Sequence, residues 1–188
     1  MTKLLPAFIL IAALTTTARA TVVLPADLGA LTRDARAIPR GRIVSVESRW
    51  TESRRGIETL VTLEAETYLK GDLGPTVQFR VPGGQLGRFR SITVGAPQFA
   101  IGQRVIVFLG AHGPSVPFVL GLGQGVFRLA RSPDGWTVTP PPVLPTAESP
   151  AGASPARPVR VVRGDPQRIA TPLGEFERRV RVLAVSPQ

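Results

Sequence analysis

Apolar and polar residues alternate through much of this chain, which is the pattern of β-strands that bury one face. In the segment IETLVTLEAETYLKG, Val61, Leu63 and Leu69 fall on one side, whereas Glu64 and Glu66 fall on the other. Strands are predicted at residues 41–50, 57–71, 76–81, 89–94, 104–110, 118–130 and 135–140. Turn-forming Gly, Pro and polar residues separate them, so we expect an all-β fold, either a small barrel or a sandwich.

Two of these segments give more specific expectations. In GRIVSVESRW, strict alternation places Val44 and Val46 on one face and Ile43 on the other. The segment RVIVFLG is apolar at nearly every position, so we expect residues 104–110 to be buried on both faces of the sheet.

Helical spacing occurs near both ends of the chain. Leu28, Leu31 and Ala35 predict a short helix over residues 27–37, which Pro39 ends. A second apolar stripe predicts a C-terminal amphipathic helix with Thr171 as its N-cap; its members are Leu173, Phe176, Val180 and Leu183. We expect this helix to pack on its own domain, with a partner's groove or a membrane surface as the alternatives.

The first twenty residues, MTKLLPAFILIAALTTTARA, have the organisation of a secretory signal peptide. Lys3 precedes an apolar stretch of 11 residues, and small residues occupy the positions before a predicted cleavage after Ala20. A membrane-spanning helix needs about 20 apolar residues, so this stretch does not indicate an anchor. We expect export to the periplasm or the medium, with no transmembrane segment in the mature chain.

Composition changes sharply after residue 139. The segment PPPVLPTAESPAGASPARP consists almost entirely of Pro, Ala, Ser and other small or polar residues, which predicts an extended or disordered linker. The expected organisation is therefore a signal peptide at 1–20, a β-domain at 21–139, a linker at 140–170, and an amphipathic helix with a tail at 171–188.

The chain contains no cysteine, so its stability has to come from an apolar core. Its formal net charge is +10, and would be +8 after loss of Lys3 and Arg19 with the leader. A basic surface of this kind suits polyanions. Because the arginines are scattered and no run exceeds two, the excess also fits a GC-rich genome.

The segment FVLGLGQGVFRLA carries three glycines at alternate positions, Gly121, Gly123 and Gly125. The spacing G-x-G-x-G differs from the dinucleotide-binding pattern, and the residues after it read as a strand, whereas a phosphate loop leads into a helix. We therefore expect a bend or bulge in a strand where another backbone approaches closely.

Candidate catalytic chemistry is sparse. His112 is the only histidine, and Ser115 is too close to it in sequence to be an obvious partner in a Ser-His-acid triad. Zinc sites need several His or Cys ligands, and no calcium loop or nucleotide motif occurs. We predict no catalytic residues, no metal and no cofactor. Nucleic acid is not an expected partner, because most aromatic residues fall on apolar faces and export removes the usual ligands.

The order GRIVSVESRW, VTLEAETYLKGD, VQFRVPGG and PQFAIGQRVIVFL resembles the OB-type barrel of the netrin-like and tissue-inhibitor-of-metalloproteinase group. It is also similar to a set of uncharacterised exported bacterial proteins with the same layout. The resemblance covers Arg42 to Leu129 and implies a small OB-like barrel. The inhibitors reach the protease zinc through an N-terminal cysteine, which this chain lacks, so that mode of inhibition does not carry over.

These observations favour an exported, non-enzymatic binding or accessory module whose partner is another exported protein, a secreted hydrolase being one candidate. The alternatives are a basic envelope protein that holds polyanions such as lipopolysaccharide or acidic glycans, and an unrecognised hydrolase. The expected contact surfaces are the loops at 83–90 and 111–118 and the C-terminal helix. The candidate binding residues are Gly83, Gly84, Gln85, Arg88, Arg90, His112, Arg178, Arg179 and Arg181.

Overall fold

The computed structural model describes residues 26–113, 115–141 and 169–185. The predicted signal peptide and most of the predicted linker lie outside these residues. The elements, in order, are α2 (Leu28–Asp34), β1 (Ile38–Trp50), β2 (Ile57–Lys70), β3 (Thr76–Pro82), β4 (Gly84–Leu86), β5 (Phe89–Ser91), β6 (Arg104–Val107), β7 (Leu109–Gly110), β8 (Phe118–Val119), the 3-10 helix η1 (Leu122–Gly125), β9 (Val126–Ser132), β10 (Gly135–Thr139), β11 (Thr171–Pro172) and α3 (Leu173–Val185).

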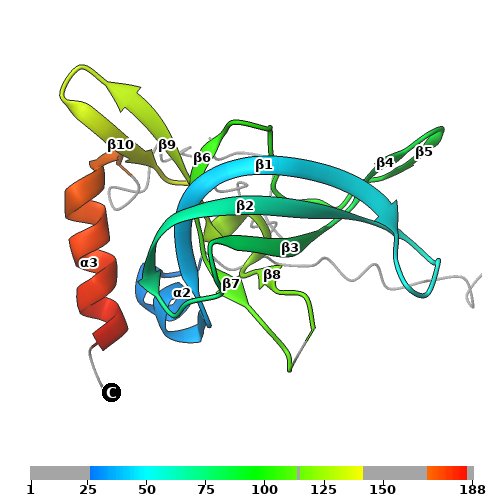
Figure 1. Cartoon of the computed structure of the whole chain (residues 1–188), viewed down its shortest axis with the longest axis horizontal. Coiled ribbons are helices and arrows are strands. Elements are labelled where there is room, and N and C mark those ends of the chain that lie inside the picture. The colour runs from blue at the N-terminus through cyan, green and yellow to red at the C-terminus, as the bar shows by residue number, and fades with distance from the viewer. Residues whose placement is uncertain (1–25, 114, 142–168, 186–188) are drawn as a thin grey trace, which may run out of the picture.

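Nine of these strands form one curled sheet, a half-barrel in the order β11-β10-β9-β6-β1-β2-β3-β8-β7. Figure 1 shows β1, β2 and β3 arching together, with the separate β4–β5 hairpin projecting at one end. Strand β3 pairs with β8 in parallel, and a bridge between Ala37 and Leu109 brings β7 back to the start of β1. The predicted mostly β, barrel-like fold with a short N-terminal helix and a C-terminal helix is confirmed.

Strand β6 is buried on both faces, as the sequence predicts. Val105 and Val107 belong to the core inside the half-barrel, together with Ile43, Leu63 and Phe79. The alternate residues Ile106 and Phe108 belong to a second core on the outer face, beneath the two helices; its other members are Leu31, Ala35, Ile38, Leu69, Phe127, Val138, Phe176 and Val180. One strand therefore supplies side chains to two separate cores.

The expected alternation in β1 is wrong at one point. The pairing of β1 with β2 shifts register between Ile43 and Ser45, so the strand bulges at Val44. Val44 is 38% exposed, whereas Ile43 is fully buried and Val46 packs against the same inner core. The bulge puts Ile43 and Val46 on one side, because the extra residue resets the two-residue period.

The glycine-rich segment is not a continuous strand that bends. Strand β8 ends at Val119, η1 spans Leu122–Gly125, and β9 then begins. The expected close approach of backbone does occur: a Cβ on Gly123 would lie 2.8 Å from the carbonyl oxygen of Gly95. A strand follows the glycines, so the segment lacks the helix that a phosphate loop requires.

The end of β2 holds the short helix α2 in place. The Lys70 ammonium donates hydrogen bonds to the carbonyl oxygens of Thr32 (2.7 Å) and Arg33 (2.9 Å), which are left unpaired at the end of the helix. The next residue, Gly71, has φ +63°, and a Cβ there would lie 2.3 Å from the carbonyl oxygen of Arg36. The Lys-Gly pair thus both binds the helix and turns the chain beneath it.

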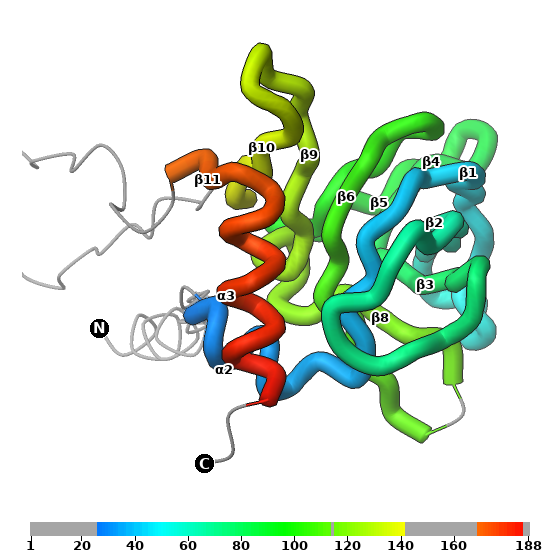
Figure 2. The backbone as a smooth tube through the Cα atoms, turned by 60° about the vertical axis from the view of Figure 1, so that its left-hand side comes forward, coloured from blue at the N-terminus to red at the C-terminus, as the bar shows by residue number. Residues whose placement is uncertain are grey.

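The C-terminal helix α3 packs on its own domain, and Figure 2 shows it beside α2 and below β11. Phe176 and Val180 of the predicted stripe are buried, and the Phe176 ring lies 4.8 Å from that of Phe127 on β9. Thr171 is not the N-cap: it pairs with Val138 in β11, and its hydroxyl donates to the Ile169 carbonyl. The helix begins only at Leu173 because the two preceding residues extend the sheet.

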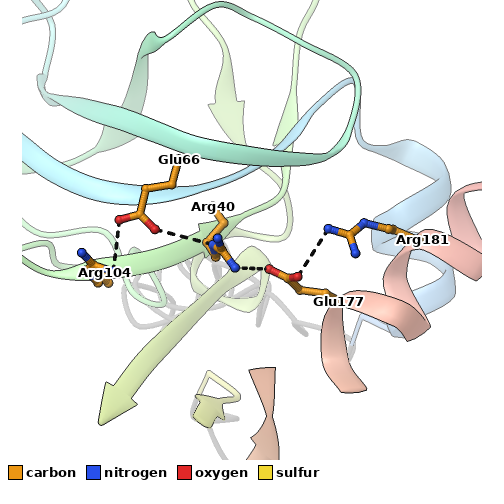
Figure 3. Close-up of polar contacts among 5 residues, drawn as sticks. All are labelled: Arg40, Glu66, Arg104, Glu177 and Arg181. Carbon is orange, nitrogen blue, oxygen red and sulfur yellow. Dashed lines mark hydrogen bonds and ion pairs between the residues drawn. The ribbon is translucent and has the colours of Figure 1, made fainter. Parts of the chain in front are cut away.

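Charged side chains join α3 to the sheet (Figure 3). Arg40 on β1 forms an ion pair with Glu177, whose second oxygen lies 3.3 Å from Arg181 one helical turn later. The Nε of Arg40 is buried without a hydrogen bond and lies 3.7 Å from Glu66, which also pairs with Arg104 at 3.2 Å. Glu177 is only 9% exposed, so its pairing is needed to offset the desolvation of its charge.

We expect Gly71→Ala to lower the free energy of unfolding by about 3 kcal/mol, because it combines left-handed backbone strain with a clash against backbone. Gly74→Ala is the matched control: its φ is +89°, but no atom lies within 4 Å of the added Cβ, so we expect only about 1 kcal/mol. Urea denaturation measures both, and equal losses would contradict the proposed contact with Arg36.

We expect Glu177→Ala to lower the free energy of unfolding by about 2 kcal/mol, since it leaves the partly buried Arg40 with Glu66 alone. Arg181→Ala removes an exposed partner of the same carboxylate and should cost less than about 1 kcal/mol. Hydrogen exchange of the α3 amides, measured alongside denaturation, should show faster exchange in Glu177→Ala. Unchanged α3 exchange in that variant would show that the pair does not hold the helix.

Candidate functional site

Two of the three predicted contact surfaces both lie next to the end of β3. Residues 83–90 follow β3 and form most of the β4–β5 hairpin, while residues 111–118 connect β7 to β8. Pro82 lines a cavity shared with Gly83 and Gly84, and it also lines a second cavity shared with His112 and Phe118. Strand β3 thus brings together two loops that lie far apart in sequence.

The third predicted surface lies elsewhere. Figure 1 shows α3 and the β4–β5 hairpin at opposite ends of the long axis of the molecule. Arg178 and Arg179 are exposed on α3 and line a cavity of about 310 Å³ on that helix, whereas Arg181 is paired with Glu177. The three arginines therefore do not join the loops in one site.

The first cavity, of about 320 Å³, lies between the β4–β5 hairpin, the ends of β1 and β2, and residues 96–99. Two hydroxyl groups hold its wall in place. The Thr59 hydroxyl donates to the Gly83 carbonyl oxygen at 2.8 Å, and the Ser48 hydroxyl accepts a hydrogen bond from the backbone N–H of Gln85 at 3.3 Å. Gly84 has no room for a side chain, because a Cβ would lie 2.5 Å from both hydroxyl oxygens. The glycines of the PGG sequence thus bring the hairpin against β1 and β2.

Large apolar side chains are exposed on and next to the β4–β5 hairpin. Trp50 is 40% exposed and Phe89 is 48% exposed, with their rings edge to face at a centroid distance of 5.4 Å. Ile92, which lines the cavity, is 73% exposed, and Val94 is 74% exposed. We call these four residues the hairpin patch.

Sequence reasoning identified the hairpin but missed Trp50, Ile92 and Val94. We expected a strand over residues 89–94, but β5 ends at Ser91, so Ile92 and Val94 are not on a buried strand face. Trp50 is the last residue of β1, where the strand extends beyond the core. The position of Trp50 at the end of the predicted strand could have indicated its exposure, because strand ends next to polar turns lie near the surface.

Arginines surround the hairpin patch. The Arg88 guanidinium lies 5.0 Å from the centre of the Phe89 ring. Arg90 lines the first cavity, and Arg54 and Arg55 lie in the turn that follows Trp50. Within the described part of the chain, none of these four arginines forms an ion pair.

The second cavity, of about 370 Å³, has mainly apolar walls with a few polar groups; its lining residues are Thr51, Ile57, Glu58, Arg80, Val81, Pro82, His112, Phe118, Val119 and Leu122. The His112 ring stacks on that of Phe118 with centroids 4.9 Å apart. Ser115 donates its hydroxyl proton to the backbone carbonyl of His112 at 2.6 Å, not to the imidazole. This contact does not build a catalytic Ser-His pair.

The pKa of the Tyr68 hydroxyl on β2 is shifted by its surroundings. Burial, with a smaller contribution from the charge of Asp72, raises the pKa of the Tyr68 hydroxyl above its ordinary value. The hydroxyl donates to the Gly74 carbonyl at 2.7 Å, so it fastens the turn after β2. Tyr68 lines neither of the two cavities at the end of β3.

Among residues 26–113, 115–141 and 169–185, no three His, Asp or Glu side chains are grouped so that they could hold a metal ion. The helices of this part of the chain are also too short or too polar to cross a membrane.

Comparison of the chain with family models, curated proteins and solved structures gives no match.

Proposed function

We propose that this chain is an exported, non-enzymatic binding module that contacts a partner protein through the hairpin patch. The observation that carries the proposal is the exposure of four large apolar side chains on or next to the β4–β5 hairpin, where Trp50 contacts Phe89 and Ile92 lines the first cavity. Exposed apolar patches of this kind mark interaction sites, since water would otherwise disfavour them. A protein contact of this kind requires no catalytic residue, metal ion or cofactor.

The composition of the patch suits a protein interface. Aromatic residues and arginine contribute most of the binding energy in protein complexes, and here Arg88 already lies over the Phe89 ring. The glycines and hydroxyls that hold the hairpin against β1 and β2 limit the conformational entropy lost on binding.

The arginines around the patch indicate the character of the partner. Arg54, Arg55, Arg88 and Arg90 place positive charge close to the apolar side chains, with Glu52 as a nearby acid. A partner surface with an apolar centre and an acidic rim would complement both features.

The same arginines favour a second candidate, a polyanion such as lipopolysaccharide or an acidic glycan. Binding of that kind depends on charge, falls steeply with salt, and needs little from apolar side chains. The two candidates therefore differ in their response to salt and to loss of an apolar side chain.

We expect Ile92→Asp to weaken partner binding at least tenfold, because it places a charge at the apolar centre of the contact. The matched control is Val185→Asp, which adds the same charge at an equally exposed valine on the distant end of α3. Both sites are exposed, so thermal unfolding should change little. Immobilised protein would be exposed to the exported proteins of the producing cell at low and high salt.

Proteins retained at high salt by wild type and Val185→Asp, but lost with Ile92→Asp, would support the proposal. Retention of polyanionic material only, released by salt and unaffected by Ile92→Asp, would overturn it in favour of the second candidate.

A further inference from the structure

We propose that the second cavity, between His112, Arg80 and Leu122, binds a carboxylate carried on a short apolar body. This site is separate from the hairpin patch, and the inference does not depend on the proposed protein partner.

The apolar body is suggested by the cavity walls. Among its lining residues, Ile57, Val81 and Val119 are buried, and Phe118 and Leu122 are partly buried. Its volume of about 370 Å³ falls within the roughly 300–1,000 Å³ range of small-molecule sites.

Arg80 determines the sign of the ligand's charge. It lies on the outward-facing side of β3, between the inward-facing Phe79 and Val81, and its side chain is exposed. Within the described residues its guanidinium forms neither an ion pair nor a hydrogen bond, so its donors remain available. Guanidinium groups bind carboxylates through two parallel hydrogen bonds.

Glu58 also lines this cavity, and its charge is already compensated. Arg49 lies opposite Glu58 on the neighbouring strand, and its Nε and Nη2 both lie 2.8 Å from one carboxylate oxygen of Glu58. Glu58 is only 9% exposed and is already paired with Arg49. It therefore does not compete with a ligand carboxylate for Arg80. Of the charged residues that line the cavity, Arg80 is therefore the one without a charged partner among the described residues.

His112 offers a further donor at the mouth of the cavity. Its ring is stacked on Phe118 at an interplanar angle of 25°, which holds the edge of the imidazole in a defined direction. Within the described residues neither ring nitrogen has a hydrogen-bond partner. A neutral imidazole carries one N–H, so it can donate to the second oxygen of a carboxylate.

The cavity wall also contains strained backbone. Leu122 has φ +56°, in the left-handed region that costs a non-glycine residue about 1 kcal/mol or more. It follows Gly121, which is also left-handed, so the chain turns sharply where Leu122 meets the cavity. Backbone strain of this kind concentrates at binding sites, and here it coincides with an uncompensated arginine.

Two sources could supply this ligand chemistry: a free short-chain or aromatic carboxylate, and the C-terminal residue of a peptide with an apolar side chain. We would titrate the full chain with hexanoate, benzoate and N-acetyl-Gly-Leu, and follow the His112 ring resonances and backbone amides by NMR. The neutral controls are hexanamide, benzamide and the peptide amide, and hexylamine is the cationic control.

We expect carboxylates to bind at least tenfold more tightly than their amides and hexylamine not to bind, with shifts at His112 and Leu122. Arg80→Gln should weaken carboxylate binding at least tenfold. Arg36→Gln removes the same charge from an exposed arginine between α2 and β1, and should leave binding unchanged. If hexanoate or benzoate binds more tightly than N-acetyl-Gly-Leu, the ligand is a small free carboxylate. If N-acetyl-Gly-Leu binds more tightly, the ligand is the C-terminus of a peptide.

Three results would overturn the proposal: equal binding of carboxylates and amides, a preference for hexylamine, or carboxylate binding that survives Arg80→Gln in a folded protein. Absence of any shift with carboxylates at about 10 mM would also overturn it, since that concentration detects even millimolar dissociation constants.

Discussion

Burial of β6 on both faces is the constraint on which the rest of this fold depends. Val105 and Val107 fill the half-barrel, while Ile106 and the next outward residue, Phe108 just beyond β6, belong to the core beneath the helices. Neither face of the strand can therefore be left to water. The inner face of β6 is covered because β1, β2 and β3 curl around the inner core. Its outer face is covered by α2 and α3, which come from the two ends of the described chain.

Polar side chains attach the two helices to the sheet. Lys70 binds the end of α2 through two carbonyl oxygens, and Arg40 binds α3 through Glu177. Lysine recurs only once after Lys3 in a chain rich in arginine, and it stands where a compact ammonium must reach two carbonyls at once. The Arg40 guanidinium instead lies between two carboxylates, from β2 and α3, a geometry that suits a planar group with several donors. Both contacts lie at the end of the molecule that carries the helices, opposite the β4–β5 hairpin.

Most elements were predictable because their signals are local. Alternation in β2 and β3, the dense apolar run of β6, and the stripe on α3 each followed from side-chain period within one segment. The errors arose where pairing overrides the local period. The bulge at Val44 depends on the register between β1 and β2, and the strand that replaces a cap at Thr171 depends on the exposed edge of β10. The candidate site shows the same division: the hairpin and His112 were found from turn composition, but Trp50, Ile92 and Arg80 were recognised only by their exposure and neighbours.

The sequence by itself determined the all-β class, the apolar face of most strands, the existence of both helices and the absence of a phosphate-loop helix after Gly125. These follow from periodicity and backbone preferences, which act over a few residues. Only the tertiary structure decided that one strand serves two cores, that the loops at 83–90 and 111–118 line two cavities that share Pro82, and that the arginines of α3 lie at the other end. Those outcomes depend on strand order and on contacts between residues distant in sequence, and no local pattern encodes either of them.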